Sequence, residues 1–203
     1  VNLDNYWNAF SYFSFGFPLP FMKSNLNLHT RASISNRPGL INNEINNNKN
    51  IGLGQGIGIS SNVGEHLDFN ISTRANYNIV RSSLQESLNN NYYTQNTTMD
   101  FYWNFASNFF IGSSVNNSLY QGLGEEFDQS VWLMNMDVGY RFLPGRKGEL
   151  KLTVFDLLNQ NTDIQTNVTD VYIENERTQT LQQFFMLTFT YNLRAFGNVN
   201  EGS

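Results

Sequence analysis

Large apolar residues alternate with polar or small residues along most of the chain, and the pattern is clearest in two segments near its end. In the first segment, every second position is apolar: Trp132, Met134, Met136, Val138, Tyr140 and Phe142. In the second segment, the alternating apolar residues are Phe185, Leu187, Phe189, Tyr191 and Leu193. Side chains of a β-strand point in turn to opposite faces. The pattern therefore predicts strands with one apolar face and one polar face.

Most other segments repeat this two-sided pattern, so the sequence predicts an all-β protein with nine strands. The expected strands are Leu3–Phe15, Met22–Ile34, Ile51–Ser61, His66–Arg81, Tyr92–Phe105, Phe109–Tyr120, Trp132–Phe142, Glu149–Leu158 and Leu181–Leu193. In the first of them the facing is ambiguous, because aromatic residues occupy both alternating sets of positions.

The connections between the expected strands alternate between short and long. Short turns carry Pro, Gly or Asn, as tight reversals require: Gly16–Phe21, Asn62–Glu65, Ala106–Asn108 and Leu143–Gly148. The longer polar links are Asn36–Asn50, Ser82–Asn91, Gln121–Gln129 and Asn159–Gln179. Short turns at one end and long loops at the other are typical of membrane barrels. We expect residues 1–196 to form an antiparallel up-and-down transmembrane β-barrel wall, with residues 197–203 as a short periplasmic tail.

The composition suits a wall with lipid on one side and neutral polar groups on the other. The chain of 203 residues is 40% hydrophobic and 15% aromatic, but only 14% charged. The net charge of −5 argues against a nucleic-acid partner, which needs clustered Lys and Arg. No apolar run is long enough for a transmembrane helix, and without cysteine there are no disulfides or thiolate metal sites. A soluble glycan-binding β-sandwich with an aromatic core is the weaker alternative, because it would not leave so much Asn facing inward.

Nine strands are an odd number, whereas single-chain bacterial barrels have an even number of strands. The chain starts at Val1 without a signal-peptide pattern. The two edges of a nine-stranded wall would also expose unpaired backbone groups, which cannot remain in lipid. We therefore expect the carboxy-terminal part of a larger barrel.

The alternation assigns side chains to the two sides of the expected wall. The expected lipid-facing residues are Trp103, Trp132, Tyr140, Phe142, Phe185, Leu187, Phe189 and Tyr191. Aromatic residues collect near the short turns, where a ring can keep its apolar body in lipid at headgroup depth and form a girdle. The residues expected to face the lumen or a plug are Lys23, Arg31, Gly54, Gly56, Asp68, Arg74, Asp100, Asp137, Arg141 and Lys151.

Charges are costly on a lipid face but can be hydrated or paired in a lumen. Our hypothesis is that Arg74, Asp137 and Arg141 contact a plug or line a substrate path, and structural pairing between strands is the open alternative. The glycines between Gly52 and Gly58 stand at every second position and no helix follows, so a nucleotide loop is disfavoured. They indicate a surface cleared of side chains, against which a plug or loop packs closely.

No pattern supports catalysis, a metal or a cofactor, so we expect none of the three. His29 and His66 lack partners at ligand spacing, and there is no Ser-His-Asp order. The acidic segment Gly124–Asp128 lacks the regular ladder of a calcium loop, which favours a solvated surface loop. The polar loops considered for ligand contact are Ile41–Asn50, Gln121–Gln129 and Thr162–Gln179.

Several segments resemble one protein family. They are Glu149-Leu-Lys-Leu-Thr-Val-Phe-Asp-Leu-Leu-Asn-Gln-Asn161, Val168-Thr-Asp-Val-Tyr-Ile-Glu174, Phe184-Phe-Met-Leu-Thr-Phe-Thr-Tyr-Asn-Leu-Arg194, Tyr120-Gln-Gly-Leu123, Phe127-Asp-Gln129 and Arg37-Pro-Gly-Leu40. Together they resemble the carboxy-terminal end of Bacteroidetes outer-membrane β-barrel proteins of the TonB-dependent receptor superfamily. The resemblance is most specific from about Val131 to Phe196.

The resemblance implies a 22-strand barrel, an upstream plug and an inner-membrane energy-coupling partner for nutrient uptake across the bacterial outer membrane. The chain departs from the family pattern at its end, Phe196-Gly-Asn-Val-Asn-Glu-Gly-Ser203, where the common terminal aromatic is absent. A non-transporting scaffold or adhesin barrel is the alternative, and a plug with a TonB box in the upstream sequence would favour transport.

Overall fold

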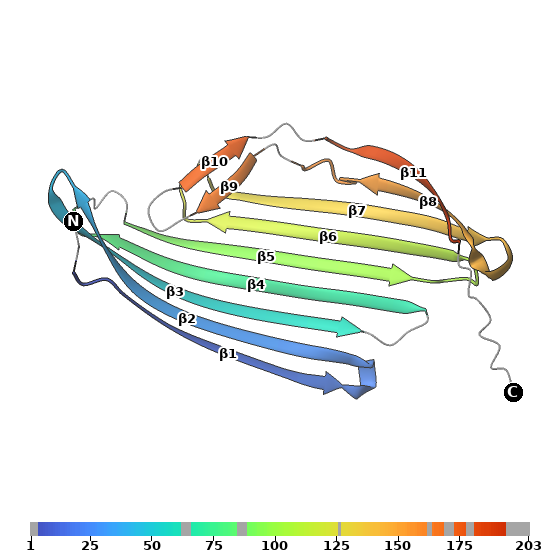
Figure 1. Cartoon of the computed structure of the whole chain (residues 1–203), viewed down its shortest axis with the longest axis horizontal. Coiled ribbons are helices and arrows are strands. Elements are labelled where there is room, and N and C mark those ends of the chain that lie inside the picture. The colour runs from blue at the N-terminus through green and yellow to red at the C-terminus, as the bar shows by residue number, and fades with distance from the viewer. Residues whose placement is uncertain are drawn as a thin grey trace, which may run out of the picture.

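The structure is a computed structural model that describes residues 4–61, 66–84, 89–125, 127–161, 164–168, 173–177 and 181–193. Nine strands form one antiparallel sheet in the order β1-β2-β3-β4-β5-β6-β7-β8-β11 (Figure 1). Their bounds are β1 Trp7–Leu19, β2 Ser24–Ile41, β3 Glu44–Ser61, β4 Leu67–Ser82, β5 Asn90–Trp103, β6 Phe109–Gln121, β7 Gln129–Phe142, β8 Gly148–Phe155 and β11 Phe184–Tyr191. The all-β, up-and-down prediction and its nine strands are confirmed.

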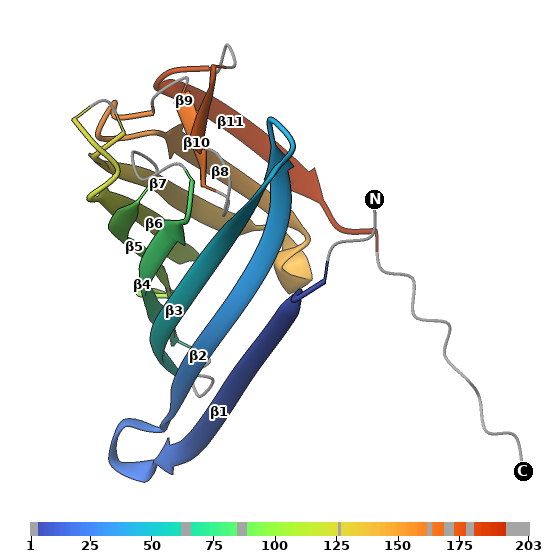
Figure 2. The same cartoon turned by 90° about the vertical axis from the view of Figure 1, so that its left-hand side faces the viewer.

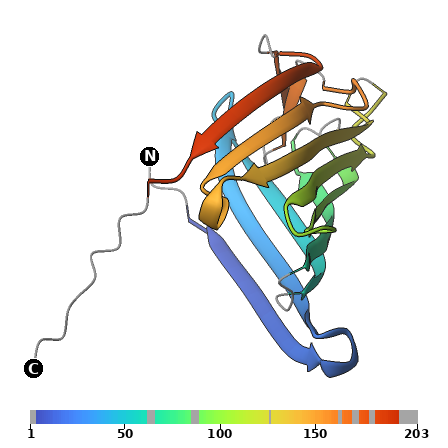
Figure 3. The ribbon, with the colours of Figure 1, turned by 90° about the vertical axis from the view of Figure 1, so that its right-hand side faces the viewer.

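The sheet is open and strongly curved. β1 and β11 are its two edges, and they do not pair with each other. Figures 2 and 3 show that the sheet curls, so that one side is concave. The described helices are two short 3-10 turns, η1 (Pro20–Met22) and η3 (Pro144–Arg146), and none of them is long and apolar enough to cross a membrane.

Strand register decides which side chains share a face, because directly paired residues of neighbouring strands point the same way. One row across the sheet is Tyr12, Arg31, Gly54, Asn76 and Thr94. We call the hollow side that carries this row and its same-side neighbours the polar face. The opposite side, which carries Trp103, Trp132, Tyr140 and Phe185, is the apolar face.

The hairpin of β2 and β3 extends further than the sequence predicts. The link Asn36–Asn50 is not a loop. The pairing of β2 with β3 continues through it without a break and ends at Ile41, which pairs with Glu44. Asn42 and Asn43 form the two-residue turn with φ of 51° and 68°. Positive φ at both central residues is what a tight hairpin requires, and Asn tolerates it. The polar residues between Asn36 and Asn50 therefore belong mainly to two paired strands and not to a loop.

Other expected elements differ in smaller ways. Lys23 is not a strand residue, since it follows η1 with φ of 47° and β2 starts at Ser24. The last long link contains a two-stranded hairpin of β9 (Ile164–Val168) and β10 (Ile173–Arg177), at the same end of the molecule as the tip of the β2–β3 hairpin (Figure 1). The expected turn Asn62–Glu65 and tail 197–203 lie outside the described residues.

The described part of the chain has almost no conventional core. Its buried hydrophobic residues are Val80, Tyr92, Phe110 and Leu123, and all four lie on the polar face or in a loop folded over it. Among the described residues, no second layer covers the apolar face. Phe185 and Leu187 are each 67% exposed, and Trp132 is 39% exposed. A β-sandwich would bury these residues between two sheets.

Aromatic rings form an unbroken belt across the apolar face near the short turns. Successive ring centroids lie 5.4, 5.9, 4.6, 6.2 and 6.1 Å apart along one chain of contacts: Trp103, Phe105, Phe109, Tyr140, Phe142 and Phe189. The belt therefore runs continuously from Trp103 on β5 to Phe189 on β11. The alternation in the sequence predicted on which face of the sheet these rings lie. The distances between their centroids show that neighbouring rings are in contact.

A polar stripe interrupts the apolar face between β2 and β6, which the alternation did not emphasise. Thr30 donates to Gln55 at 2.8 Å, and the hydroxyls of Thr73 and Thr97 lie 2.9 Å apart. Asn117 donates to the Val131 carbonyl at 3.1 Å. The stripe is thus bonded within itself, as polar groups in an apolar setting must be.

Candidate functional site

The polar face collects the predicted lumen residues. The register places on it Arg31, Gly54, Gly56, Asp68, Arg74, Asp100, Asp137, Arg141 and Lys151. The predicted lipid-facing residues all lie on the other side: Trp103, Trp132, Tyr140, Phe142, Phe185, Leu187, Phe189 and Tyr191. Lys23 is the exception, because it lies in the turn between β1 and β2 and has no place on either face.

A hollow of about 860 Å³ occupies the polar face over β1 to β6, and we call it the polar hollow. Its walls are mostly amides and hydroxyls, among them Asn27, Asn70, Asn78, Thr98 and Ser118. Such groups both donate and accept hydrogen bonds. The polar hollow is therefore suited to a hydrated or hydroxylated occupant and unsuited to an apolar one.

The glycines of β3 form the floor of the polar hollow, but the flanking strands already use part of the space they leave. A Cβ at Gly52 would lie 2.7 Å from Ser33 Oγ, and one at Gly54 would lie 2.8 Å from Asn76 Oδ1. At Gly56 the nearest atom is His29 Cβ, at 3.4 Å. Side chains of β2 and β4 therefore lean over the glycine strand, which explains these glycines without a plug.

The charges of the polar face are segregated along the strands. The polar hollow is lined by His29, Arg31, Arg37 and Arg74, and none of its described lining residues is Asp or Glu. The nearest acidic pair, Asp68 and Asp100, lines a smaller hollow of about 520 Å³ toward the short turns. The polar face thus has a basic part over β2–β4 and an acidic part beside it.

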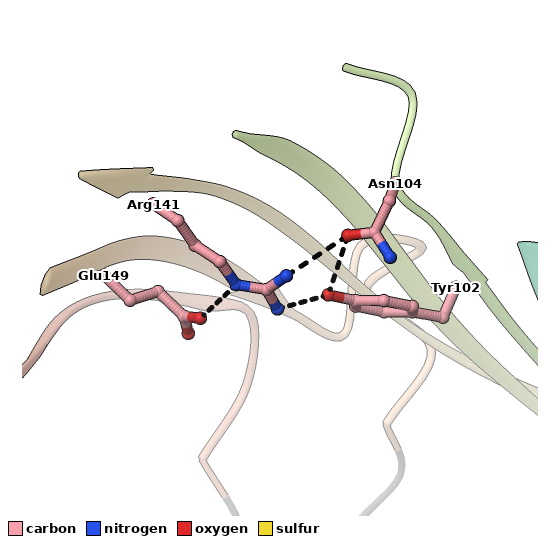
Figure 4. A network of polar contacts seen from close by, with 4 residues as sticks. All are labelled: Tyr102, Asn104, Arg141 and Glu149. Atoms are coloured by element: carbon pink, nitrogen blue, oxygen red, sulfur yellow. Dashed lines mark hydrogen bonds and ion pairs between the residues drawn. The ribbon is translucent and has the colours of Figure 1, made fainter. Parts of the chain in front are cut away.

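Arg141 is held by groups from β5, the segment after β5, β6 and β8. Its Nε donates to Glu149 Oε2 at 3.0 Å, and Nη2 donates to the Tyr102 hydroxyl at 2.6 Å. Nη1 donates to Asn104 Oδ1 at 3.3 Å (Figure 4), and the guanidinium lies 4.7 Å from the Phe110 ring centroid. With these partners Arg141 ties the short-turn end together, which favours the structural alternative for this residue.

Asp137 is also bonded to its neighbours. Thr153 Oγ1 donates to Asp137 Oδ1, and Lys151 Nζ lies 3.9 Å from the same oxygen. Like Arg141, the Asp137 carboxylate is bonded to side chains of a neighbouring strand. Of the three residues proposed to meet a plug or substrate, Arg74 is the one that has no such contact among the described residues.

His29 lies against β1. Its Nδ1 is 2.8 Å from the Tyr12 hydroxyl and 3.0 Å from Ser14 Oγ, and its ring stacks on Tyr12 with centroids 6.1 Å apart. Within the described ranges, no group of three or more His, Cys, Asp or Glu residues could hold a metal ion.

The loop between β6 and β7 packs Leu123 and Phe127 over the polar face, while Gly124, Glu125 and Asp128 of the expected solvated loop are exposed. Leu123 is 7% exposed and packs with Val80 and Tyr92, while Phe127 contacts the same cluster. Asp128 Oδ1 accepts the Leu123 N–H at 2.8 Å, which closes the loop on itself. Asp128 therefore serves as a cap for the loop.

The sequence analysis missed the role of Asp156, which stands in one of the segments quoted for the family resemblance. Asp156 is 5% exposed, has a φ of 49°, and accepts the N–H groups of Gln160 and Asn161 at 3.0 and 2.9 Å. Gln160 Oε1 in turn accepts the Trp132 N–H at 3.2 Å. The motif therefore encodes an exposed turn at the end of β8 that is closed by the buried Asp156 carboxylate. The acidic residue followed by Asn-rich sequence was the available signal.

Of the polar loops considered for ligand contact, Ile41–Asn50 is mainly strand, and Gln121–Gln129 is mostly exposed but packs Leu123 and Phe127 against the sheet. The third, Thr162–Gln179, is described only as the backbone of β9 and β10. No family model, curated protein or solved structure matches the chain. The family resemblance therefore stays a prediction.

Proposed function

We propose that this sheet is part of the wall of a bacterial outer-membrane β-barrel, of the type found in TonB-dependent receptors, and that the whole protein takes up a nutrient. The observation that carries the proposal is the uncovered apolar face with its aromatic belt. Burial of apolar surface is worth roughly 25 cal/mol per Å², so water is an unfavourable environment for such a face. Hydrocarbon flanked by headgroups suits both the face and the belt.

The open edges support a barrel larger than the described sheet. β1 and β11 each have a side without a partner strand in the described sheet, and both carry exposed aromatic residues such as Phe13 and Phe189. Unpaired backbone groups are not tolerated in lipid. Further strands from the same protein would complete the ladder and enclose the polar face as a lumen.

A transport role rests on the nature of the enclosed space and on the family resemblance. The polar hollow is wide, hydrated in character and without a catalytic or metal-binding cluster among the described residues. In this proposal an upstream plug of the same protein fills the lumen. An inner-membrane energy-coupling protein supplies the energy, and the barrel itself needs no cofactor.

The membrane assignment is tested with the whole protein encoded by the gene, reconstituted in vesicles that contain brominated lipid. Trp7, Trp103 and Trp132 should be quenched, because all three are exposed on the apolar face, and the triple variant W7F/W103F/W132F should be quenched less than the wild type. A protein that stays soluble without detergent and shows no quenching would refute the membrane wall.

The transport class needs a separate measurement. The reconstituted protein should bind the periplasmic domain of an inner-membrane energy-coupling protein, and deletion of its upstream plug should abolish that binding. A membrane-inserted protein that does not bind this domain would point instead to the scaffold or adhesin class.

A further inference from the structure

We propose that the polar hollow binds a solute carrying carboxylate or phosphate groups, with Arg31 and Arg74 as its charged contacts. The inference rests on the proposed barrel, in which the polar face lines the path of the transported molecule. It adds a substrate class to that function, since a lumen wall alone could serve neutral, cationic or anionic solutes.

The two arginines flank the glycine strand in adjacent rows. Arg31 on β2 pairs with Gly54 on β3, and Arg74 on β4 pairs with Gly56. Neighbouring strands lie about 4.8 Å apart, so the backbones of β2 and β4 are roughly 10 Å apart across the glycines. The two guanidinium groups therefore approach one floor from opposite sides, with His29 and Asn76 completing the two rows.

Both arginines are available to a ligand. Each is exposed, and neither has a hydrogen bond or ion pair with any described residue, whereas Arg141 is bonded to Glu149, Tyr102 and Asn104. A guanidinium presents a planar fork of N–H donors that matches a carboxylate or phosphate. Arg31 and Arg74 thus have donor groups that the fold itself does not use.

The distribution of charge favours an anion over other solutes. The chain as a whole carries a net charge of −5, yet the described lining of the polar hollow contains basic side chains and no acidic ones. Asp68 and Asp100 lie beside it, toward the short turns. A concave wall lined by charges of one sign concentrates ions of the opposite sign. The neutral amides and hydroxyls around the arginines would bind the remaining oxygen atoms of the solute.

The test is isothermal titration of the whole detergent-solubilised protein with citrate and with inorganic phosphate, and with glucose as a neutral probe. The protein variants are Arg31→Gln, Arg74→Gln and the double variant. Lys49→Gln is the matched control, because Lys49 lies on β3 but on the apolar face. Each single change should weaken binding of the anion about two- to fivefold, as for solvated ion pairs, and the double change by about five- to twentyfold. Added salt should weaken wild-type binding as well.

The outcomes separate this inference from the proposed function. Equal citrate and phosphate affinities in the wild type and the double variant, with Trp quenching by lipid retained, would overturn the anion site and leave the barrel intact. Loss of heat stability without loss of affinity would also overturn it, because the arginines would then pair with a protein group such as a plug carboxylate. Absence of lipid quenching would reject the barrel. If anion binding then still depended on Arg31 and Arg74, the anion site in the polar hollow would be supported without the barrel.

Discussion

The ring of Phe110 occupies the space above Gly139, its direct partner on the neighbouring strand. A Cβ at Gly139 would overlap ring atoms Cζ and Cε1 of Phe110. The ring is 3% exposed and is also in contact with Arg141 and Tyr102. Glycine is therefore required at position 139 by a side chain, and the fit of these two residues anchors the network at the short-turn end.

Gly139→Ala should destabilise the folded protein, because the Phe110 ring would have to leave its place between Gly139 and the Arg141 guanidinium. Overpacking of this kind costs about 1–3 kcal/mol. Urea unfolding of the protein in detergent micelles measures the change. Gly39→Ala is the control, because a Cβ there meets nothing within 4 Å. Equal stability of the two variants would show that the ring is not fixed.

Arg141→Gln should weaken the short-turn end because it removes the ion pair with Glu149 and the bonds to Tyr102 and Asn104. The side chains of Arg141 and Glu149 are only 27% and 24% exposed, so solvent screens the pair incompletely. A double-mutant cycle with Glu149→Gln should give a coupling of about 1 kcal/mol in unfolding free energy. A coupling near zero would mean that the pair is as weak as an ordinary surface contact.

Asp156→Ala should destabilise the turn after β8 because it leaves the N–H groups of Gln160 and Asn161 without an acceptor. The expected loss of unfolding free energy is about 1–3 kcal/mol. Asp156→Asn should lose less, since one oxygen acceptor remains and Asn tolerates the positive φ. Asp68→Ala removes the same charge from an exposed position and serves as control. If the two alanine variants unfold alike, the capping role of Asp156 is wrong.

Lysine substitutions at two adjacent residues of β4 should have very different effects on stability if the apolar face contacts lipid. Ile71 is exposed on the apolar face, while Ser72 lines the polar hollow. Ile71→Lys should destabilise the protein folded in lipid vesicles by about 2–4 kcal/mol if residue 71 lies at the midplane. Ser72→Lys should change this stability little. Urea titration of folding into vesicles provides the measurement. Comparable effects at both positions would contradict a lipid-facing surface.

Much of the fold follows from local alternation. A strand has a period of two whatever its neighbours are, so the side of Arg74, Asp100, Trp132 and Phe185 could be predicted from the segments that contain them. Pro and Gly likewise marked the short turns. The extended β2–β3 hairpin was missed because apart from Leu40, Ile41 and Ile45 its side chains are mostly polar, so the segment carries no sustained alternation. Its turn residues Asn42 and Asn43 were the usable signal.

The sequence by itself determined that this chain forms two-faced antiparallel strands and, outside the ambiguous first strand and Lys23, which of the assigned residues lie on each face. Only the tertiary structure decided which residues meet: the fixed Arg141, the available Arg31 and Arg74, the Phe110 ring over Gly139 and the continuous aromatic belt. The physical reason is that facing depends on one strand alone. Contact depends on the register between strands and on the curvature of the whole sheet, and these are set by many distant pairings together.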